Sequence, residues 1–236
     1  MQSHHNQQWL IETARTTAAQ MHGRDLEARR TVFNVLIDVP AVVLGSSQHS
    51  SSQNLDEMLL DLEACERAGV EVVKRRSGGG LVYLAPKRHI WIDVVIARGD
   101  ILWSDDVVLS AQWLGDAWCR ALATLGHRDL RVHREATVQT QLGRLICFTG
   151  SGAGEVYCGN HKLVGISQRR TSKLARFQCT IHRAWEPQQL LNLLSDEARD
   201  VVAINGGSAA MSDLVATTSH DAETVMAALV DQLQTL

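Results

Sequence analysis

The sequence has no long hydrophobic run and no recognisable export signal. No uninterrupted apolar segment approaches the roughly 18–20 residues that a membrane span requires. The opening residues, MQSHHNQQWLIETART, lack the basic region followed by an apolar region that marks a secretory signal. We therefore expect a cytoplasmic protein that does not bind membranes.

The sequence also lacks closely spaced cysteines and metal-binding histidine motifs. The five cysteines form no CxxC pair: Cys65, Cys119, Cys147, Cys158 and Cys179. The ten histidines include no HExxH or similar spacing. An odd number of scattered cysteines argues against a disulfide framework and favours a reducing compartment, and neither residue type predicts a metal site.

Charge is low overall, but it is distributed unevenly. The formal net charge is −3, which gives no general reason to expect nucleic-acid binding. No acid lies between Glu71 and Asp93, a stretch with five basic residues, and none lies between Glu155 and Glu186, a stretch with six. Two basic stretches in a net-acidic chain indicate a local anion site.

The hydrophobic pattern predicts an α+β fold with a mixed, largely antiparallel central sheet flanked by helices. Two short strands are predicted within 31–48, on either side of Pro40. The other predicted strands cover 70–74, 81–84, 90–97, 130–133, 145–149, 154–159, 162–167 and 176–182. One helix is predicted from Ser52 or Asn54 to Gly69, and three more cover 105–126, 187–194 and 220–235.

Three consecutive glycines stand out in KRRSGGGLVYLAPKRH, residues 74–89. They form neither the GxxxxGK[ST] pattern of a P-loop nor the GxGxxG pattern that opens a dinucleotide-binding helix. Glycine loses more conformational entropy on folding than any other residue, so three in a row suggest a backbone that must approach a ligand closely. The amides of Gly78, Gly79 and Gly80 can form an anion-binding concavity, with Arg75 and Arg76 beside it.

A second segment strengthens this interpretation. GNHKLVGISQRRT, residues 159–171, places a lysine on a short strand before a glycine and a Ser-Gln pair. KRRSGGGLVY and HKLVGISQRR together resemble the motifs Arg-Arg-x-Ser-Gly-Gly-Gly-x-Val-Tyr and Lys-x-x-Gly-x-Ala/Ser-Gln of the lipoate–protein ligase and octanoyltransferase family. PAVVLGSSQ, residues 40–48, is similar to the strand that precedes the family's first helix.

The resemblance covers about residues 30–185 and implies a single catalytic domain over 1–236, with a helical C-terminal segment, 186–236. It implies transfer of lipoyl or octanoyl to a lysine of a lipoyl carrier domain, through an acyl-adenylate made from ATP with Mg. Lys162 would be the catalyst, since a fixed ammonium stabilises negative charge on the acyl carbonyl oxygen. The residues implied in substrate binding are Arg75, Arg76, Ser77, Gly78, Gly79, Gly80, Val82, Gly165, Ser167 and Gln168. Val82 is expected to line the slot for the lipoate or octanoate chain.

A second possibility needs no ATP. Some octanoyltransferases of this family carry Cys-Phe-x-x-Pro-Ser-x-Tyr-Glu, and this chain has CFTGSGAGE with Cys147 fifteen residues before Lys162. A nearby ammonium favours the nucleophilic thiolate, which would form an acyl-thioester. The Pro-Ser pair is missing, however, and LICFTG is also typical of a buried strand.

Departures from the family pattern keep a third hypothesis open, a non-catalytic partner protein that binds an acyl group or a nucleotide. LAPKRHIW, residues 84–91, replaces the usual His-Asp-x-Gly-Asn-like run. FQCTIH places Cys179 where the family has histidine, and the chain is too short for the ligases' accessory domain. The expected partner is a lipoyl carrier domain, in the E2 subunit of a dehydrogenase complex or a glycine-cleavage H-type protein. An acyl carrier protein or a separate accessory protein are further expected partners.

Overall fold

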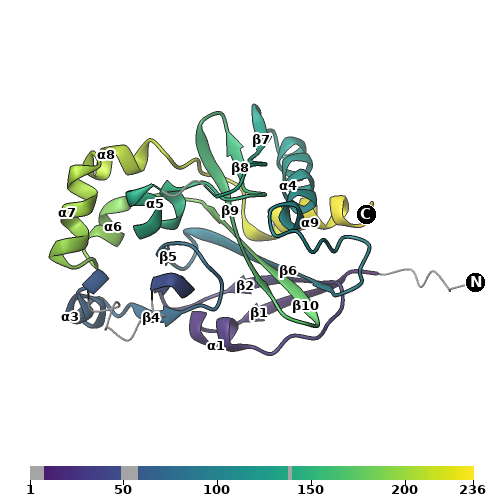
Figure 1. Ribbon diagram of the computed structural model, residues 1–236, viewed down its shortest axis with the longest axis horizontal. Coiled ribbons are helices and arrows are strands. Elements are labelled where there is room, and N and C mark those ends of the chain that lie inside the picture. The colour runs from purple at the N-terminus through teal and green to yellow at the C-terminus, as the bar shows by residue number, and fades with distance from the viewer. Residues whose placement is uncertain (1–7, 49–57, 138–139) are drawn as a thin grey trace, which may run out of the picture.

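The computed structural model describes residues 8–48, 58–137 and 140–236, and its centre is a seven-stranded sheet (Figure 1). The strand order is β1-β2-β6-β10-β9-β8-β7. The strands are β1 (Leu10–Arg15), β2 (Thr31–Leu36), β6 (His89–Ala97), β7 (Leu130–Val132), β8 (Val156–Cys158), β9 (His161–Arg170) and β10 (Leu174–His182). Among the described strands of this sheet, only β1 and β2 pair in parallel. The predicted mixed, largely antiparallel sheet is therefore confirmed.

A smaller sheet packs against one face of the large one. It contains β3 (Ala41–Leu44), β4 (Glu71–Lys74) and β5 (Val82–Leu84), with β3 in the centre. Its apolar side chains pack on residues from β2 and β6, in a core that includes Val43, Val82, Trp91 and Val95. The helix α1 (Ala18–Gly23) belongs to the same layer and begins with a capping box at Thr17. The glycine loop connects the two edge strands of this small sheet.

Two helices cover the opposite face of the large sheet. They are α4 (Gln112–Thr124) and α9 (Ala222–Leu233), which lie side by side in Figure 1. The Asp221 side chain caps the start of α9 by accepting from Thr224 N. Alternate residues of β6 point to this face, so Ile90, Ile92, Val94 and Ile96 share a core with α4 and α9, whereas Trp91 and Val95 face the small sheet. The strand β6 is consequently buried on both of its faces.

Short helices form one end of the molecule (Figure 1). They are α3 (Leu62–Arg67), α5 (Gln141–Leu145), α6 (Pro187–Leu191), α7 (Asp196–Ile204) and α8 (Gly207–Ser212). A separate apolar cluster holds them together and includes Leu145, Leu194, Val202 and Met211. None of the helices within 8–48, 58–137 and 140–236 combines the length and apolarity needed to cross a bilayer.

Several predicted elements differ from the structure. The strand predicted over 145–149 is wrong, because α5 ends at Leu145 and a 3-10 turn, η3 (Cys147–Thr149), follows. The helix predicted from residue 105 begins later. The Asp106 side chain accepts from Val108 N and Leu109 N, the 3-10 turn η2 (Leu109–Ala111) follows, and α4 begins at Gln112. The C-terminal tail contains α7 and α8 in addition to the two predicted helices.

The helix predicted up to Gly69 lies partly outside the described residues. Within them, a break at Leu60, which pairs with Leu194, separates residues 58–59 from α3. Asp61 caps α3 by accepting from Ala64 N, and Gly69 follows its end with φ of +63°. The predicted role of Gly69 in ending the helix is confirmed.

Candidate active site

The conformation of the glycine loop is fixed by the residues that pack around it. Gly79 has φ of +99°, a conformation that side chains disfavour. A methyl group on Gly45 would lie 1.7 Å from Gly79 O, so two backbone segments touch here without room for a side chain. The Arg75 guanidinium is buried, and its Nη2 donates to Gly78 O (2.8 Å) and Gly80 O (3.0 Å). Arg75 therefore shapes the loop from within.

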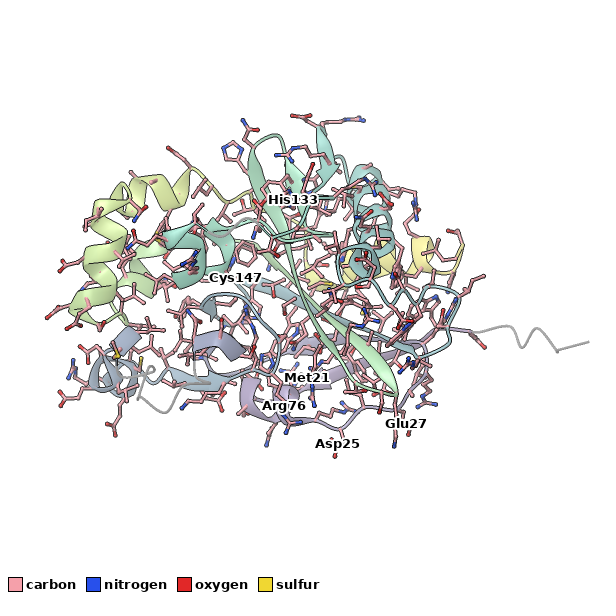
Figure 2. The ribbon with its side chains drawn as sticks, in the orientation of Figure 1. Met21, Asp25, Glu27, Arg76, His133 and Cys147 are labelled. Atoms are coloured by element: carbon pink, nitrogen blue, oxygen red, sulfur yellow. The ribbon has the colours of Figure 1, made fainter. Side chains whose placement is uncertain are left out.

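The second arginine of the motif lies elsewhere. Arg76 is exposed and is not among the residues that line the cavity around Lys162. Figure 2 places it on the side of the molecule where Met21 and Asp25 lie, away from Cys147. Burial, and then repulsion from the charges of Arg76 and Arg176, lower the pKa of Arg169. Arg76 therefore lies close enough to Arg169 for their charges to interact. Contact of Arg76 with a bound phosphate stays a prediction.

Ser77 belongs to a buried hydrogen-bond chain. Its hydroxyl donates to Gln178 Oε1 (2.9 Å) and lies 3.2 Å from Ser167 Oγ, so the two predicted serines meet. The Gln178 amide nitrogen lies 3.0 Å from His22 Nδ1. Burial, with the charges of Arg176 and Arg75, lowers the pKa of His22 to about 3, which keeps this imidazole neutral.

Lys162 is buried, with only 1% of its side chain exposed. Its Nζ donates to Glu155 Oε2 (2.7 Å) and to Cys147 O (2.9 Å), and it lies 5.6 Å from the centre of the Phe148 ring. Burial by itself lowers the pKa of Lys162, but Glu155, with smaller contributions from Cys147 and Tyr157, raises it above the ordinary value. The side chain is consequently an ammonium.

Cys147 lies between the glycine loop and Lys162. Its amide donates to Leu81 O (2.9 Å), which fixes η3 beside the end of the loop. A methyl group on Gly79 would come within 3.3 Å of Cys147 Sγ, so the thiol faces the second glycine. Figure 2 shows Cys147 near the middle of the molecule, beside α5. Cys147 is half-buried and lies in a 3-10 turn, so it is not part of a buried strand.

These groups line two neighbouring spaces, an outer cavity and an inner slot. The outer cavity has a volume of about 470 Å³ and is lined by Gly78, Gly79, Gly80, Cys147, Glu155, Lys162, Ser167 and Gln168 among others. The inner slot is far smaller, about 30 Å³, and is lined by Arg75, Val82, Gly165, His22 and Trp91 among others. Cys147, Ile166 and Ser167 line both spaces. The inner slot is mostly apolar, and Cys147 is part of the wall of both spaces.

Two residues of the lysine motif have structural tasks. A methyl group on Gly165 would lie 3.0 Å from the Phe148 ring, so glycine lets this ring pack beneath Lys162. The Gln168 side chain donates to Val107 O (2.7 Å) and accepts from Ser110 (2.6 Å). It thereby fixes the segment before η2 at the edge of the outer cavity.

Neither departure from the family pattern lines the outer cavity, although Leu84 and Trp91, the two ends of the 84–91 segment, line the inner slot. In the 84–91 loop, Arg88 forms an ion pair with Glu186, and Arg183 donates to Lys87 O, so the loop packs on the segment after β10. Cys179 is buried in the core beneath α4, where burial raises the pKa of its thiol. Its replacement of histidine changes the core and leaves the cavity lining unchanged.

Two site residues were missed by the sequence-based prediction. Glu155 ends the CFTGSGAGE segment at the position of the transferase motif's glutamate, which was an available signal. His22 lies in α1, outside every recognised motif, and only the fold brings it to the inner slot.

The lipoyl protein ligase A/B catalytic domain, as a family model, matches residues 11–234. The chain belongs to this family. The match is wider than residues 30–185, over which the motifs were recognised, because β1 and α9 are also part of the domain. No curated protein sequence matches the chain.

Solved structures of lipoate–protein ligases share the fold. Lipoate-protein ligase A bound with ATP is 15% identical with a TM-score of 0.67, and the alignment covers 96% of this chain and 83% of that one. A bipartite ligase from Thermoplasma acidophilum, studied with its E2 lipoyl domain, is 15% identical with a TM-score of 0.68, covering 96% and 82%. LipL1 from P. falciparum in complex with lipoate is 11% identical with a TM-score of 0.63, covering 97% and 62%. At these identities the similarity establishes the fold.

Proposed function

We propose that this protein transfers a lipoyl or octanoyl group to the ε-amine of a lysine on a lipoyl carrier domain. The observation that carries the proposal is that Lys162, Cys147 and the Gly78–Gly80 loop line one cavity in a chain of this family. The apolar lining of the inner slot, which includes Val82 and Cys147, supports a place for the acyl chain, and at about 30 Å³ the slot would have to widen to admit it.

Lys162 supplies the electrostatic part of the reaction. An ammonium has three N–H donors, and within the described residues two of them are used, by Glu155 and by Cys147 O. The third is available for the acyl carbonyl oxygen, where negative charge develops as the acceptor amine attacks. A preorganised donor of this kind often makes the largest contribution to catalysis.

The outer cavity fits a nucleotide. Its volume of about 470 Å³ lies within the roughly 300–1,000 Å³ that small-molecule sites occupy. Gly78 and Gly79 are exposed and line this cavity, where they present backbone without a side chain. We infer that the Gly78–Gly80 amides, with Arg144 on the cavity wall, would hold the phosphate of ATP. When bound with Mg, ATP would activate the acid as an adenylate.

Cys147 favours a second candidate function, transfer from a carrier-bound acyl thioester without ATP. Cys147 lines both the slot and the cavity, which supports its thiol as the group that would meet the acyl carbon. In this reaction Cys147 Sγ attacks the acyl carbon, and the donor thiol leaves with the proton. The acceptor amine then attacks the enzyme thioester, loses a proton and regenerates the Cys147 thiol.

The T. acidophilum ligase studied with its E2 lipoyl domain supports a lipoyl domain as the partner of this chain. That enzyme is bipartite, which supports the proposal that any accessory protein here is a separate chain. A non-catalytic binding role would leave Lys162 with a structural task only, in its ion pair with Glu155.

Intact-mass measurements of this protein and of the lipoyl domain identify the acyl donor. The protein and its Cys147→Ser variant would be incubated with an apo lipoyl domain, either with ATP and octanoate or with an octanoyl thioester donor. The ligase predicts ATP-dependent transfer that survives Cys147→Ser. The thioester route predicts a hydroxylamine-sensitive adduct on the protein, which Cys147→Ser removes. Binding without transfer under either condition would contradict both routes.

A further inference from the structure

Glu155 makes contacts that join three parts of the site. Its Oε2 accepts from Lys162 Nζ and from Gly152 N, each at 2.7 Å, and its Oε1 accepts weakly from Ile166 N at 3.4 Å. The side chain is 4% exposed and lines the outer cavity. One carboxylate therefore links the lysine, the 150–154 loop and the strand β9.

The chain is shaped to bring Glu155 into this position. Gly154, directly before it, has φ of +85°, and a methyl group there would lie 2.7 Å from Ala111. A methyl group on Gly115 of α4 would in turn lie 2.4 Å from Gly154 O. The turn thus packs tightly against the start of α4 at a position where the transferase motif has tyrosine. Close packing of this turn fixes the direction of the Glu155 carboxylate.

We propose that Glu155 is a positioning residue of the reaction, whose carboxylate holds Lys162 in the cavity as an ammonium and aims its third N–H at the acyl carbonyl oxygen. The proposal rests on the role of Lys162 in the proposed function. It assigns Glu155 no contact with the substrate.

The charges around Lys162 support this role. The titratable groups that face Nζ are Glu155 before β8, Tyr157 on β8 and Cys147 in η3. The C-terminal segment 214–218 also packs against Lys162, but it contributes backbone hydrogen bonds, from Lys162 N to Leu214 O and from Ala216 N to Lys162 O. Glu155 is thus the carboxylate among these neighbours, and without it burial lowers the pKa of Lys162.

The expected pH dependence follows from these signs. In the wild type the pKa of Lys162 is raised, so its ammonium persists through alkaline pH. Glu155→Gln removes the largest charge that opposes burial and leaves the smaller contributions of Cys147 and Tyr157, so the pKa of Lys162 falls and the side chain loses its proton as the pH rises. The acceptor lysine titrates equally for both proteins, so the ratio of wild-type to variant rates isolates Lys162. We expect this ratio to be small near pH 6 and to grow to roughly 100-fold near pH 9, the cost of losing one preorganised charged donor.

The direct test is an NMR titration of the lysine Cε signals in the whole protein, from about pH 6 to about pH 10. The Lys162 signal is assigned by its absence from Lys162→Met. We expect it to stay in the charged form over this range in the wild type and to titrate in Glu155→Gln. Glu155→Asp withdraws the carboxylate by one methylene, so its titration should fall between the two. It also serves if Glu155→Gln does not fold.

Glu135→Gln is the matched control, because it removes a carboxylate that is largely exposed and pairs with His133 instead of Lys162. It should titrate and react like the wild type. A Lys162 signal that stays charged in Glu155→Gln, or a rate ratio that does not change with pH, would overturn the inference. Since the NMR titration needs no substrate, a wild type that transfers nothing refutes the proposed function while the positioning of Lys162 is judged separately.

Discussion

Replacing Lys162 with methionine should separate the structural and catalytic contributions of one side chain. Methionine has a similar length and no charge, so it fills the space beneath the cavity. It leaves Glu155 buried opposite an apolar group, with Gly152 N as its remaining close donor. The variant also removes the N–H that we assign to the acyl oxygen.

The loss of stability and the loss of transfer rate differ in size, and a second substitution should restore only the stability. Removing one partner of a buried ion pair typically costs about 3–5 kcal/mol, because the other charge stays buried and unpaired. For a chain of this size each kcal/mol lowers Tm by roughly 2–4 °C, so we expect a fall of roughly 6–20 °C. Loss of the oxyanion donor should slow transfer roughly 100- to 1,000-fold. The double variant Lys162→Met/Glu155→Gln removes both charges and should regain most of the stability but none of the rate.

Urea unfolding measures the change in stability, and single-turnover transfer to a lipoyl domain measures the change in rate. A Lys162→Met protein as stable as the wild type would show that the Glu155 pair is not buried in solution. A variant that transfers at the wild-type rate would refute the role of Lys162 in catalysis. A double variant that regains the rate would show that charge balance, and not the ammonium, is what the reaction requires.

Two further predictions concern the glycine loop and the buried histidines. Gly79→Ala should lower the free energy of unfolding by about 1–3 kcal/mol, since its φ is +99° and its new methyl would lie 2.8 Å from Arg75 Nη2. Gly78→Ala, whose methyl would meet nothing within 4 Å, is the control and should unfold like the wild type in urea; equal losses in both variants would contradict the loop geometry. Burial lowers the pKa of His22 and His182 to about 3 and that of His89 to about 4, so the unfolded chain binds protons that the folded chain does not. Stability should therefore fall as the pH drops below about 6.5, by about 1 kcal/mol per histidine near pH 5.5, and a urea midpoint that is constant between about pH 7.5 and 5.5 would count against it.

The local motifs of the site could be predicted because each is contiguous in sequence. The glycine loop and the Lys162 strand carry their residue types at fixed spacing, and the fold brings them together as expected. Arg75 shows the limit of this reasoning. A cation beside three glycines predicts an anion ligand, yet its guanidinium donates to the loop's own carbonyls. The direction of a long side chain depends on packing that local sequence does not specify.

The elements that were missed share a physical cause. The apolar run at 145–149 resembles a strand, but buried short turns have the same composition, and periodicity does not distinguish them over five residues. The pair of Glu155 and Lys162 depends on the hairpin of β8 and β9 together with the turn at Gly154. His22 reaches the inner slot only because α1 packs over the large sheet with the small sheet beside it. Such contacts between distant segments are set by tertiary structure.

The most direct test of the central claim is the intact mass of an apo lipoyl domain after incubation with this protein. One sample contains ATP with lipoate or octanoate, and another contains an octanoyl thioester donor. We predict that the lipoyl domain gains one acyl group in one of the two samples, and that replacing its acceptor lysine abolishes the gain. A lipoyl domain that stays unmodified in both samples, with this protein shown to be folded, would contradict the claim that the chain is an acyltransferase.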